Sequence, residues 1–339
     1  MKAPSKRRLG ETDVEVSEFG FGGAPLGELF VTVPEPQAQA TLSAAWDGGI
    51  RYYDTAPFYG YGQSEHRIGH FLRQQSRDDF ILSTKIGRVL TPTRDLTSFD
   101  RGVWAGGLPF DFYYDYSYDG VMRSWENSIQ RLGLASIDLL LIHDLDQFFW
   151  QDVQLSAYEQ QLRASGWRAL EELKQDGRIR AIGAGINVSS AIPRLLNLVD
   201  LDFFIVAMPY TLLDQAVLDE EFPLCQERGV GIVLGSPFAS GILVTGPVEG
   251  ARYAYGIASE DILEKTRRIQ AVCERHEVAL PCAAIHFALA HPSVAAIIPG
   301  GFQPDHVQQN LAAYGRSIPS DLWAELKAEG LLRADAPTP

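Results

Sequence analysis

Short apolar runs alternate with amphipathic stretches along nearly the whole chain of 339 residues. Apolar runs of this length, bounded by polar or turn residues, are typical of parallel strands that are buried on both faces. The pattern predicts strands over 19–23, 50–54, 80–85, 137–143, 179–185, 203–207, 230–235 and 294–299. It predicts helices over 36–47, 64–74, 119–132, 166–175, 190–199, 214–227, 259–275 and 304–314. These strand–helix units, which have no linker between them, predict an α/β fold, one (β/α)8 TIM barrel that forms a single domain over 1–339.

Three long segments and the C-terminal part of the chain fall outside this repeat. Segments 86–118, 144–164 and 237–258 each follow a predicted strand, so we expect long loops at the carboxyl-terminal face of the barrel. Residues 319–330 predict an extra packing helix, and 331–339 are expected to form a loose tail. The alternative arrangement of the same units is an open, doubly wound sheet.

Three consecutive predicted strands end on an ionisable residue. Asp54 ends the second strand, Lys85 the third and His143 the fourth, and Tyr59 follows on the loop after Asp54. Alone, each has an ordinary structural explanation, as a helix cap, half of a salt bridge, a satisfied core histidine or a packing tyrosine. Because the carboxyl ends of barrel strands meet at one face, where the active sites of such barrels lie, we expect these four side chains to converge.

The chemistry of these four residue types suits proton transfer. A tyrosine hydroxyl has a reference pKa near 10, so only about 0.1% is ionised at neutral pH. Contact with the Lys85 ammonium would lower the pKa of Tyr59, and the Asp54 carboxylate would keep that lysine charged. His143 could donate a hydrogen bond to a substrate oxygen. The set therefore predicts an acid–base site for a carbonyl or an alcohol.

Composition narrows the function further. The formal net charge of −14 argues against nucleic-acid binding, which needs a concentrated basic face. The three cysteines are scattered and form no metal-binding spacing, which indicates reduced thiols and no metal. We find no secretory signal and no apolar run long enough for a membrane helix. We expect a cytoplasmic protein, a monomer or weak homo-oligomer, whose partner is a small-molecule substrate rather than a membrane.

Several motifs resemble the aldo-keto reductase family. They are DTAPFYGYGQSE at 54–65, TK at 84–85 and LLIHD at 140–144, and the likeness extends from about 9 to 313. The segments DYSYDGVMRSWENSIQRLGL and YTLLDQ are similar to one branch, the bacterial D-threo-aldose (L-fucose) 1-dehydrogenases with pyridoxal 4-dehydrogenase. The resemblance implies that Tyr59 is the general acid/base, that Asp54 and Lys85 tune it, and that His143 orients the substrate. We also expect substrate contacts from Tyr59 and His143, and from Phe58 and Trp104, which are among the aromatic residues at or near the predicted barrel mouth. Packing within the loops is the alternative role for these aromatic residues.

The resemblance also implies where a cofactor binds. The chain has no GxGxxG motif, so no Rossmann domain is predicted; the family holds a nicotinamide dinucleotide on the barrel itself. Asn187 would bind the carboxamide and Tyr210 would stack on the nicotinamide ring. The implied cofactor-binding residues are Gly22, Gly23, Asp54, Asn187, Tyr210, Ser236, Pro237, Phe238, Ser240, Gly241, Gly300, Gly301, Gln309 and Asn310.

Two departures from the family pattern bear on the cofactor. Ala207 stands where many members have a second carboxamide ligand, a glutamine. Segment 299–310 has no lysine or arginine, which NADP-dependent relatives use to bind the 2′-phosphate. We therefore predict NAD rather than NADP.

Together these features predict an NAD-dependent oxidoreductase that oxidises a small cyclic hemiacetal, an aldose or pyridoxal, to its lactone. Three alternatives stay open at this point. They are an NADP-dependent aldehyde or ketone reductase of broad specificity, a Schiff-base aldolase that uses Lys85, and a non-catalytic, redox-sensing binding subunit.

Overall fold

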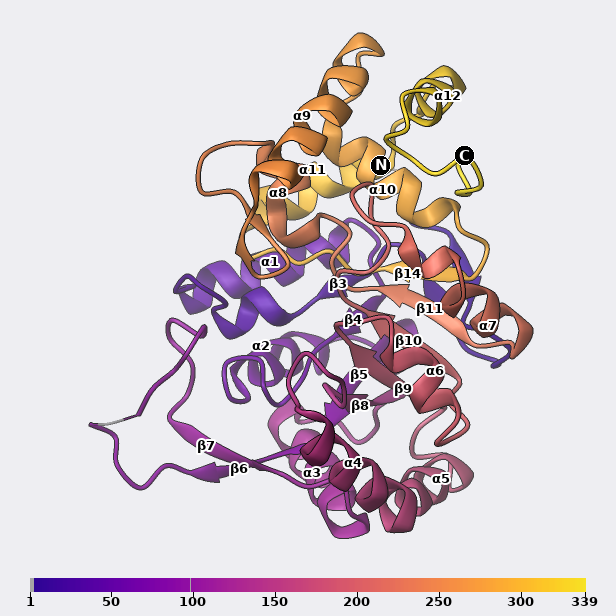
Figure 1. The fold of residues 1–339 in the computed structure, drawn as a ribbon. Helices are drawn as coiled ribbons and strands as arrows, with labels where there is room; N and C mark the ends of the chain where they lie inside the picture. The colour runs from indigo at the N-terminus through magenta and orange to yellow at the C-terminus, as the bar shows by residue number, and fades with distance from the viewer. Residues whose placement is uncertain (1–2, 98) are drawn as a thin grey trace.

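The computed structural model describes residues 3–97 and 99–339 and has a central barrel of parallel strands (Figure 1). In order around the barrel, the strands are β3 (Phe21–Gly22), β4 (Tyr52–Asp54), β5 (Ile81–Ile86), β8 (Leu139–His143), β9 (Ala181–Ile186), β10 (Phe203–Val206), β11 (Gly231–Leu234) and β14 (Val294–Ile297). Parallel bridges from Phe19 to Ile297 and from Gly22 to Gly300 join the first strand to the last. The predicted (β/α)8 barrel is thus confirmed, and the open sheet is excluded.

The barrel interior is packed with apolar side chains from alternate strand positions. Tyr52 belongs to this inner cluster, whereas its neighbour Tyr53 packs in the outer core. An N-terminal hairpin of β1 (Lys6–Arg8) and β2 (Glu15–Ser17) adds buried Leu9, Val14 and Val16 to the same cluster. Its strands are too short to be predicted from sequence. The hairpin covers the amino-terminal end of the barrel, so the opposite end carries the open face.

The helices surround the barrel. They are α1 (Glu35–Asp47), α2 (Gln63–Leu72), α3 (Tyr118–Leu132), α4 (Asp152–Gln161), α5 (Trp167–Gln175), α6 (Ala191–Leu196), α7 (Glu221–Glu227), α8 (Ile242–Thr245), α9 (Glu260–Arg275), α10 (Leu280–Ala290), α11 (Pro304–Tyr314) and α12 (Ser320–Ala328). Helix α10 was not predicted, because its sequence LPCAAIHFALA is apolar on nearly every side and has no helical period of polar residues. No helix in the described part of the chain is long and apolar enough to cross a membrane.

The three long loops carry more regular structure than expected. Segment 86–118 contains an antiparallel hairpin of β6 (Arg88–Pro92) and β7 (Phe110–Tyr114). Segment 144–164 contains α4, and segment 237–258 contains α8 and a second hairpin, β12 (Arg252–Tyr253) and β13 (Gly256–Ile257). Residues of all three loops line the main cavity, so their predicted position at the rim is confirmed.

The predicted loose tail is wrong. Leu331, Leu332 and Ala336 are buried, with exposed fractions of 2%, 3% and 1%. The guanidinium of Arg333 pairs with the carboxylates of Asp219 and Asp335. The end of the chain therefore packs against the barrel, because its few apolar residues reach the hydrophobic core.

Candidate active site

One cavity of about 500 Å³ opens at the carboxyl ends of the strands. Its walls are largely aromatic and aliphatic, and Tyr59, Lys85 and His143 are among the lining residues. Asp54 lies directly beside Lys85. The four residues that were predicted to converge therefore lie together, on elements that are separated by up to 89 positions in sequence but adjacent in the barrel.

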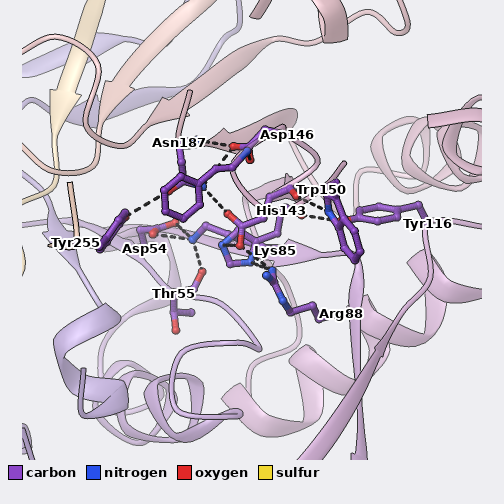
Figure 2. A network of polar contacts seen from close by, with 12 residues as sticks. Asp54, Thr55, Lys85, Arg88, Tyr116, His143, Asp146, Trp150, Asn187 and Tyr255 are labelled. Carbon is purple, nitrogen blue, oxygen red and sulfur yellow. Dashed lines mark hydrogen bonds and ion pairs between the residues drawn. The ribbon is translucent and has the colours of Figure 1, made fainter. Parts of the chain in front are cut away.

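Asp54 and Lys85 form a buried ion pair, each 2% exposed (Figure 2). Strands β4 and β5 are neighbours, which brings Lys85 Nζ to 2.7 and 2.9 Å from the Asp54 oxygens and to 2.7 Å from Thr55 O. Ser83 Oγ donates a further bond of 2.6 Å to Asp54 Oδ1. Burial raises the pKa of Asp54 and lowers that of Lys85, while the ion pair opposes both shifts. Three oxygen acceptors around Nζ suit an ammonium group.

Tyr59 stands above this pair. The Lys85 ammonium lies 4.6 Å from the centroid of its ring, and the ring of His143 is 5.8 Å away. A tight contact between two glycines holds its loop: a Cβ on Gly27 would meet Tyr59 C at 2.4 Å, and Gly60 has a φ of +64°. Phe58 and Trp104 pack edge-on at 5.3 Å beside it, in the cavity wall. A larger residue at either glycine would displace the tyrosine.

The structure reverses the predicted direction of the Tyr59 pKa. Burial raises this pKa well above its usual 10.0, the carboxylates of Asp54 and Asp144 raise it further, and Arg88 opposes them. The positive charge of Lys85 is balanced by the Asp54 carboxylate, with which it forms an ion pair at 2.7 Å. Without a ligand, Tyr59 is therefore the protonated phenol, the form that acts as a general acid.

This state can be measured in the free protein. We expect tyrosinate absorbance, recorded as wild type minus Tyr59→Phe, to show no ionisation of Tyr59 up to pH 10, since a raised pKa keeps the proton bound. The circular dichroism spectra of the two proteins must match at each pH. A difference signal that titrates near neutral pH would contradict the structure.

His143 ends β8, beside Tyr59 and Phe58. Burial lowers its pKa well below 6.5, and the positive charges of Arg88 and Lys85 lower it further. The imidazole is therefore neutral at pH 7. In that state one of its ring nitrogens donates a hydrogen bond and the other accepts one.

Two charged residues that were not predicted, Arg88 and Asp144, lie next to His143, and Figure 2 shows the arginine there. Arg88 Nη1 is 2.8 Å from Asp144 Oδ2, and both side chains are buried. Asp144 could have been noticed in the sequence, because this carboxylic acid directly follows the strand-end histidine. Arg88 could not, because its segment reads as an ordinary loop.

Asn187, just after β9, is held from two sides. Its Nδ2 donates to Asp144 Oδ1 at 2.9 Å, and its backbone N–H donates to Asp146 Oδ2 at 2.6 Å. Its Oδ1 is thus the atom left to face the cavity, where the Tyr255 hydroxyl reaches it at 3.3 Å. Beside it, small or aliphatic residues, Gly185, Ile205 and Ala207, line the cavity. An amide acceptor beside small and aliphatic side chains fits a nicotinamide ring with its carboxamide.

The sequence pattern of the Aldo/keto reductase family matches residues 18–329. The chain belongs to the aldo-keto reductase family. It is similar to pyridoxal 4-dehydrogenase of Microbacterium luteolum, with 40% identity over 341 residues, 98% of this chain and 99% of that protein. It is also similar to D-threo-aldose 1-dehydrogenase of a Pseudomonas species, with 40% identity and coverage of 96% of each chain. A solved aldo-keto reductase of Bacillus halodurans in its holo form has a TM-score of 0.74, 27% identity and coverage of 98% of each chain.

This aldo-keto reductase is accordingly an NAD(P)-dependent oxidoreductase with a small-molecule substrate. The family assignment favours hydride transfer over the aldolase and the binding subunit. Among residues 3–97 and 99–339, no three His, Cys, Asp or Glu side chains are placed to hold a metal ion.

One residue implied to bind the cofactor, Tyr210, lies away from the cavity in this structure. Tyr210 is 1% exposed and packs against Phe222, Phe287 and His291, with ring centroids 5.1, 5.0 and 5.4 Å away. It does not line the cavity. Met208 and Tyr210 have φ values of 77° and 79°, so the backbone after β10 turns the tyrosine outward against α7 and α10. In this conformation the ring is not open to a nicotinamide, and the implied stacking stays a prediction.

The other implied cofactor residues lie at neighbouring strand ends. Ser236, Pro237, Phe238, Ser240 and Gly241 follow β11, and Gly300, Gly301, Gln309 and Asn310 lie between β14 and the end of α11. These strands are adjacent in the barrel, so the two segments can share one extended ligand. Gly22 and Gly23 have a packing reason to be glycine, since a Cβ on either would meet backbone oxygen at 2.5 Å. Their contact with a cofactor stays a prediction.

Proposed function

We propose that this aldo-keto reductase is an NAD-dependent dehydrogenase of a small cyclic hemiacetal, either an aldose such as L-fucose or another D-threo-aldose, or pyridoxal, and that its product is the lactone. The observation that carries the proposal is the convergence of Tyr59 and His143 at one cavity wall above the buried Asp54–Lys85 pair. The printed names of the two relatives at 40% identity support this choice of substrate class.

In this proposal each side chain has one task. The nicotinamide, when bound, supplies the acceptor for the hydride that leaves the hemiacetal carbon. In the oxidative direction Tyr59 would first release its own proton, which the positive charge of an oxidised nicotinamide would favour by lowering the pKa of the phenol. The tyrosinate would then take the proton of the hydroxyl on that carbon, so that the C–O bond becomes the lactone C=O. His143 donates a hydrogen bond to the same oxygen and positions it. Asp54 and Lys85 supply a fixed, buried dipole under the tyrosine.

The cavity walls suit a flat or partly apolar substrate. Phe58, Trp104, Phe148 and Phe149 line the side next to Tyr59 and His143. Aromatic faces pack well against a pyridine ring and against the C–H surface of a sugar. Both kinds of substrate fit such walls, so both enter the test.

The proposed preference for NAD draws on the segment after β14. This segment, 299–310, has no lysine or arginine, and burial lowers the pKa of its one histidine, His306. That imidazole is therefore neutral at pH 7 and is already bonded to Gln303 at 2.8 Å. A 2′-phosphate there would lose charge-assisted hydrogen bonds of about 1.5–3 kcal/mol each.

A single absorbance screen tests substrate and cofactor together. We expect NADH to form with NAD and at least one of L-fucose, D-arabinose, D-galactose and pyridoxal, and simple alcohols to be poor. With NADP, kcat/KM should be roughly tenfold lower or more, since one lost charge-assisted bond amounts to at least that factor. His306→Arg should raise kcat/KM for NADP alone. A strong NADP preference of the wild type would refute the cofactor proposal, and activity on none of the hemiacetals would refute the substrate class.

We further propose that the chain works as one barrel domain in the cytoplasm, as a monomer or weak homo-oligomer. The three buried free cysteines and the strongly acidic composition support this setting.

A further inference from the structure

A second buried ion pair, between Arg88 and Asp144, lies beside His143. Figure 2 shows Arg88 next to the imidazole. Arg88 and Asp144 are 2% and 5% exposed, and 2.8 Å separates Nη1 from Oδ2. Arg88 begins β6, in the loop after β5, while Asp144 follows β8 directly. The two ion pairs have different neighbours, because Arg88 contacts the imidazole of His143 whereas Lys85 lies against the ring of Tyr59.

Aromatic rings enclose the arginine. Its guanidinium carbon lies 4.1 Å from the ring centroid of Phe58, 4.8 Å from that of Tyr114 and 5.1 Å from that of Phe149. Two desolvated charges in such surroundings stabilise a fold no better than apolar residues of similar volume. Fold stability alone therefore gives no reason for a charged pair at this place.

The backbone at Asp144 has a left-handed conformation that places its side chain beside His143. Its φ of 53° lies in the left-handed region, which aspartate tolerates better than most residues with a Cβ. Two side chains hold this conformation: the Tyr116 hydroxyl donates to His143 O at 2.8 Å, and Trp150 Nε1 donates to Asp144 O at 3.0 Å. This left-handed turn brings the Asp144 carboxylate to 3.4 Å from the imidazole.

The two neighbours of the imidazole favour one tautomer. Arg88 Nη1 lies 3.3 Å from His143 Nδ1, and a guanidinium only donates, so Nδ1 must be the acceptor. A neutral imidazole that accepts at Nδ1 carries its proton on Nε2, and Asp144 Oδ2, 3.4 Å from Nε2, favours a proton there. At 3.4 Å this second contact is too long for a strong bond, which leaves the Nε2–H available to another acceptor.

We propose that Arg88 and Asp144 are positioning residues, which hold His143 in the tautomer with the proton on Nε2 and so aim an N–H donor at the reacting oxygen. The catalytic half of this inference rests on the proposed function, whereas the tautomer itself does not. Asp144 has a second task, because its other oxygen accepts the Asn187 amide at 2.9 Å. One carboxylate thereby orients the substrate-binding and the cofactor-binding side chains together.

The tautomer can be read without any activity. We would label histidine with ¹⁵N, record long-range ring correlations of the free wild type, and assign His143 by its loss in His143→Gln. The expected result is a protonated Nε2 with a non-protonated Nδ1. A protonated Nδ1, or an imidazolium, at pH 7 overturns the proposal. Because this spectrum needs only the wild type, it decides even where a variant fails to fold.

Variants then test whether Arg88 and Asp144 set the tautomer of His143. In Arg88→Met/Asp144→Asn, which leaves no unpaired charge, we expect a mixture of tautomers and a kcat that is lower by roughly 10²-fold, with a smaller change in KM. Arg88→Lys keeps a cationic donor and should retain more of kcat. The matched control is Arg77→Met, which breaks the Arg77–Asp138 pair before the opposite end of β8 and should leave tautomer and kcat unchanged.

Each result separates the two hypotheses. An unchanged Nε2–H tautomer in the double variant, with or without loss of kcat, overturns the positioning role. If the wild type shows the expected tautomer but oxidises none of the hemiacetals, the proposed function fails and the tautomer assignment stands.

Discussion

Replacing Tyr59 with phenylalanine is expected to lower kcat by about 10²–10⁴-fold, the range in which one positioned acid–base group contributes to catalysis. The change removes only the hydroxyl. The remaining ring keeps its packing beside Trp104 and His143, at 5.7 and 5.8 Å, and its place near Lys85 Nζ. We therefore expect an unaltered fold and an NADH dissociation constant close to that of the wild type. Steady-state kinetics and a fluorescence titration with NADH measure the two quantities.

The control for this variant is Tyr53→Phe. Tyr53 lies on β4, packs in the outer core and donates to Ile50 O at 3.2 Å, so its loss removes one hydroxyl away from the cavity. Its kcat should match that of the wild type. Near-normal turnover in Tyr59→Phe would take the acid–base role away from Tyr59.

The second large effect concerns stability. Lys85→Met should lower the free energy of unfolding by about 3–5 kcal/mol, because it leaves the Asp54 carboxylate buried without its cation. Lys85→Met/Asp54→Asn removes both charges and should recover more than half of that loss. Urea denaturation, followed by circular dichroism, measures each value. Both variants should have a much lower kcat, which distinguishes this pair from a purely structural one.

A surface pair provides the comparison. Arg168 and Glu172 are 3.6 Å apart and largely exposed, so Arg168→Met should change the free energy of unfolding little. A Lys85→Met protein as stable as the wild type would show that Asp54 is already neutral in the fold. The assignment of an ion pair under Tyr59 would then be wrong.

Much of the fold followed from sequence, since each barrel strand is a compact apolar run with a clear polar boundary. Elements without such a contrast were missed. Helix α10 has no polar face to give a period, and the hairpin of β1 and β2 has strands of only three residues. The tail was misjudged because Leu331, Leu332 and Ala336 are too few to form a pattern, although each finds a place in the core.

In the site, too, the sequence did not predict features that depend on backbone angles or on distant partners. Tyr210 was assigned by its position after a strand, but the direction of a side chain depends on backbone angles, and a φ of 79° turns this one into the core. Arg88 was missed because its partner stands 56 residues away, and nothing in a local pattern connects the two.

The sequence by itself determined the barrel and the placing of Asp54, Lys85 and His143 at the ends of successive strands. Strand ends can be read locally, and barrel closure brings them to one face. Only the tertiary structure decided the raised pKa of Tyr59, the ring environment of Arg88 and the contacts of Asp144 with His143 and Asn187. Those properties depend on burial and on distances of a few ångströms between segments far apart in the chain, and these arise when the chain folds.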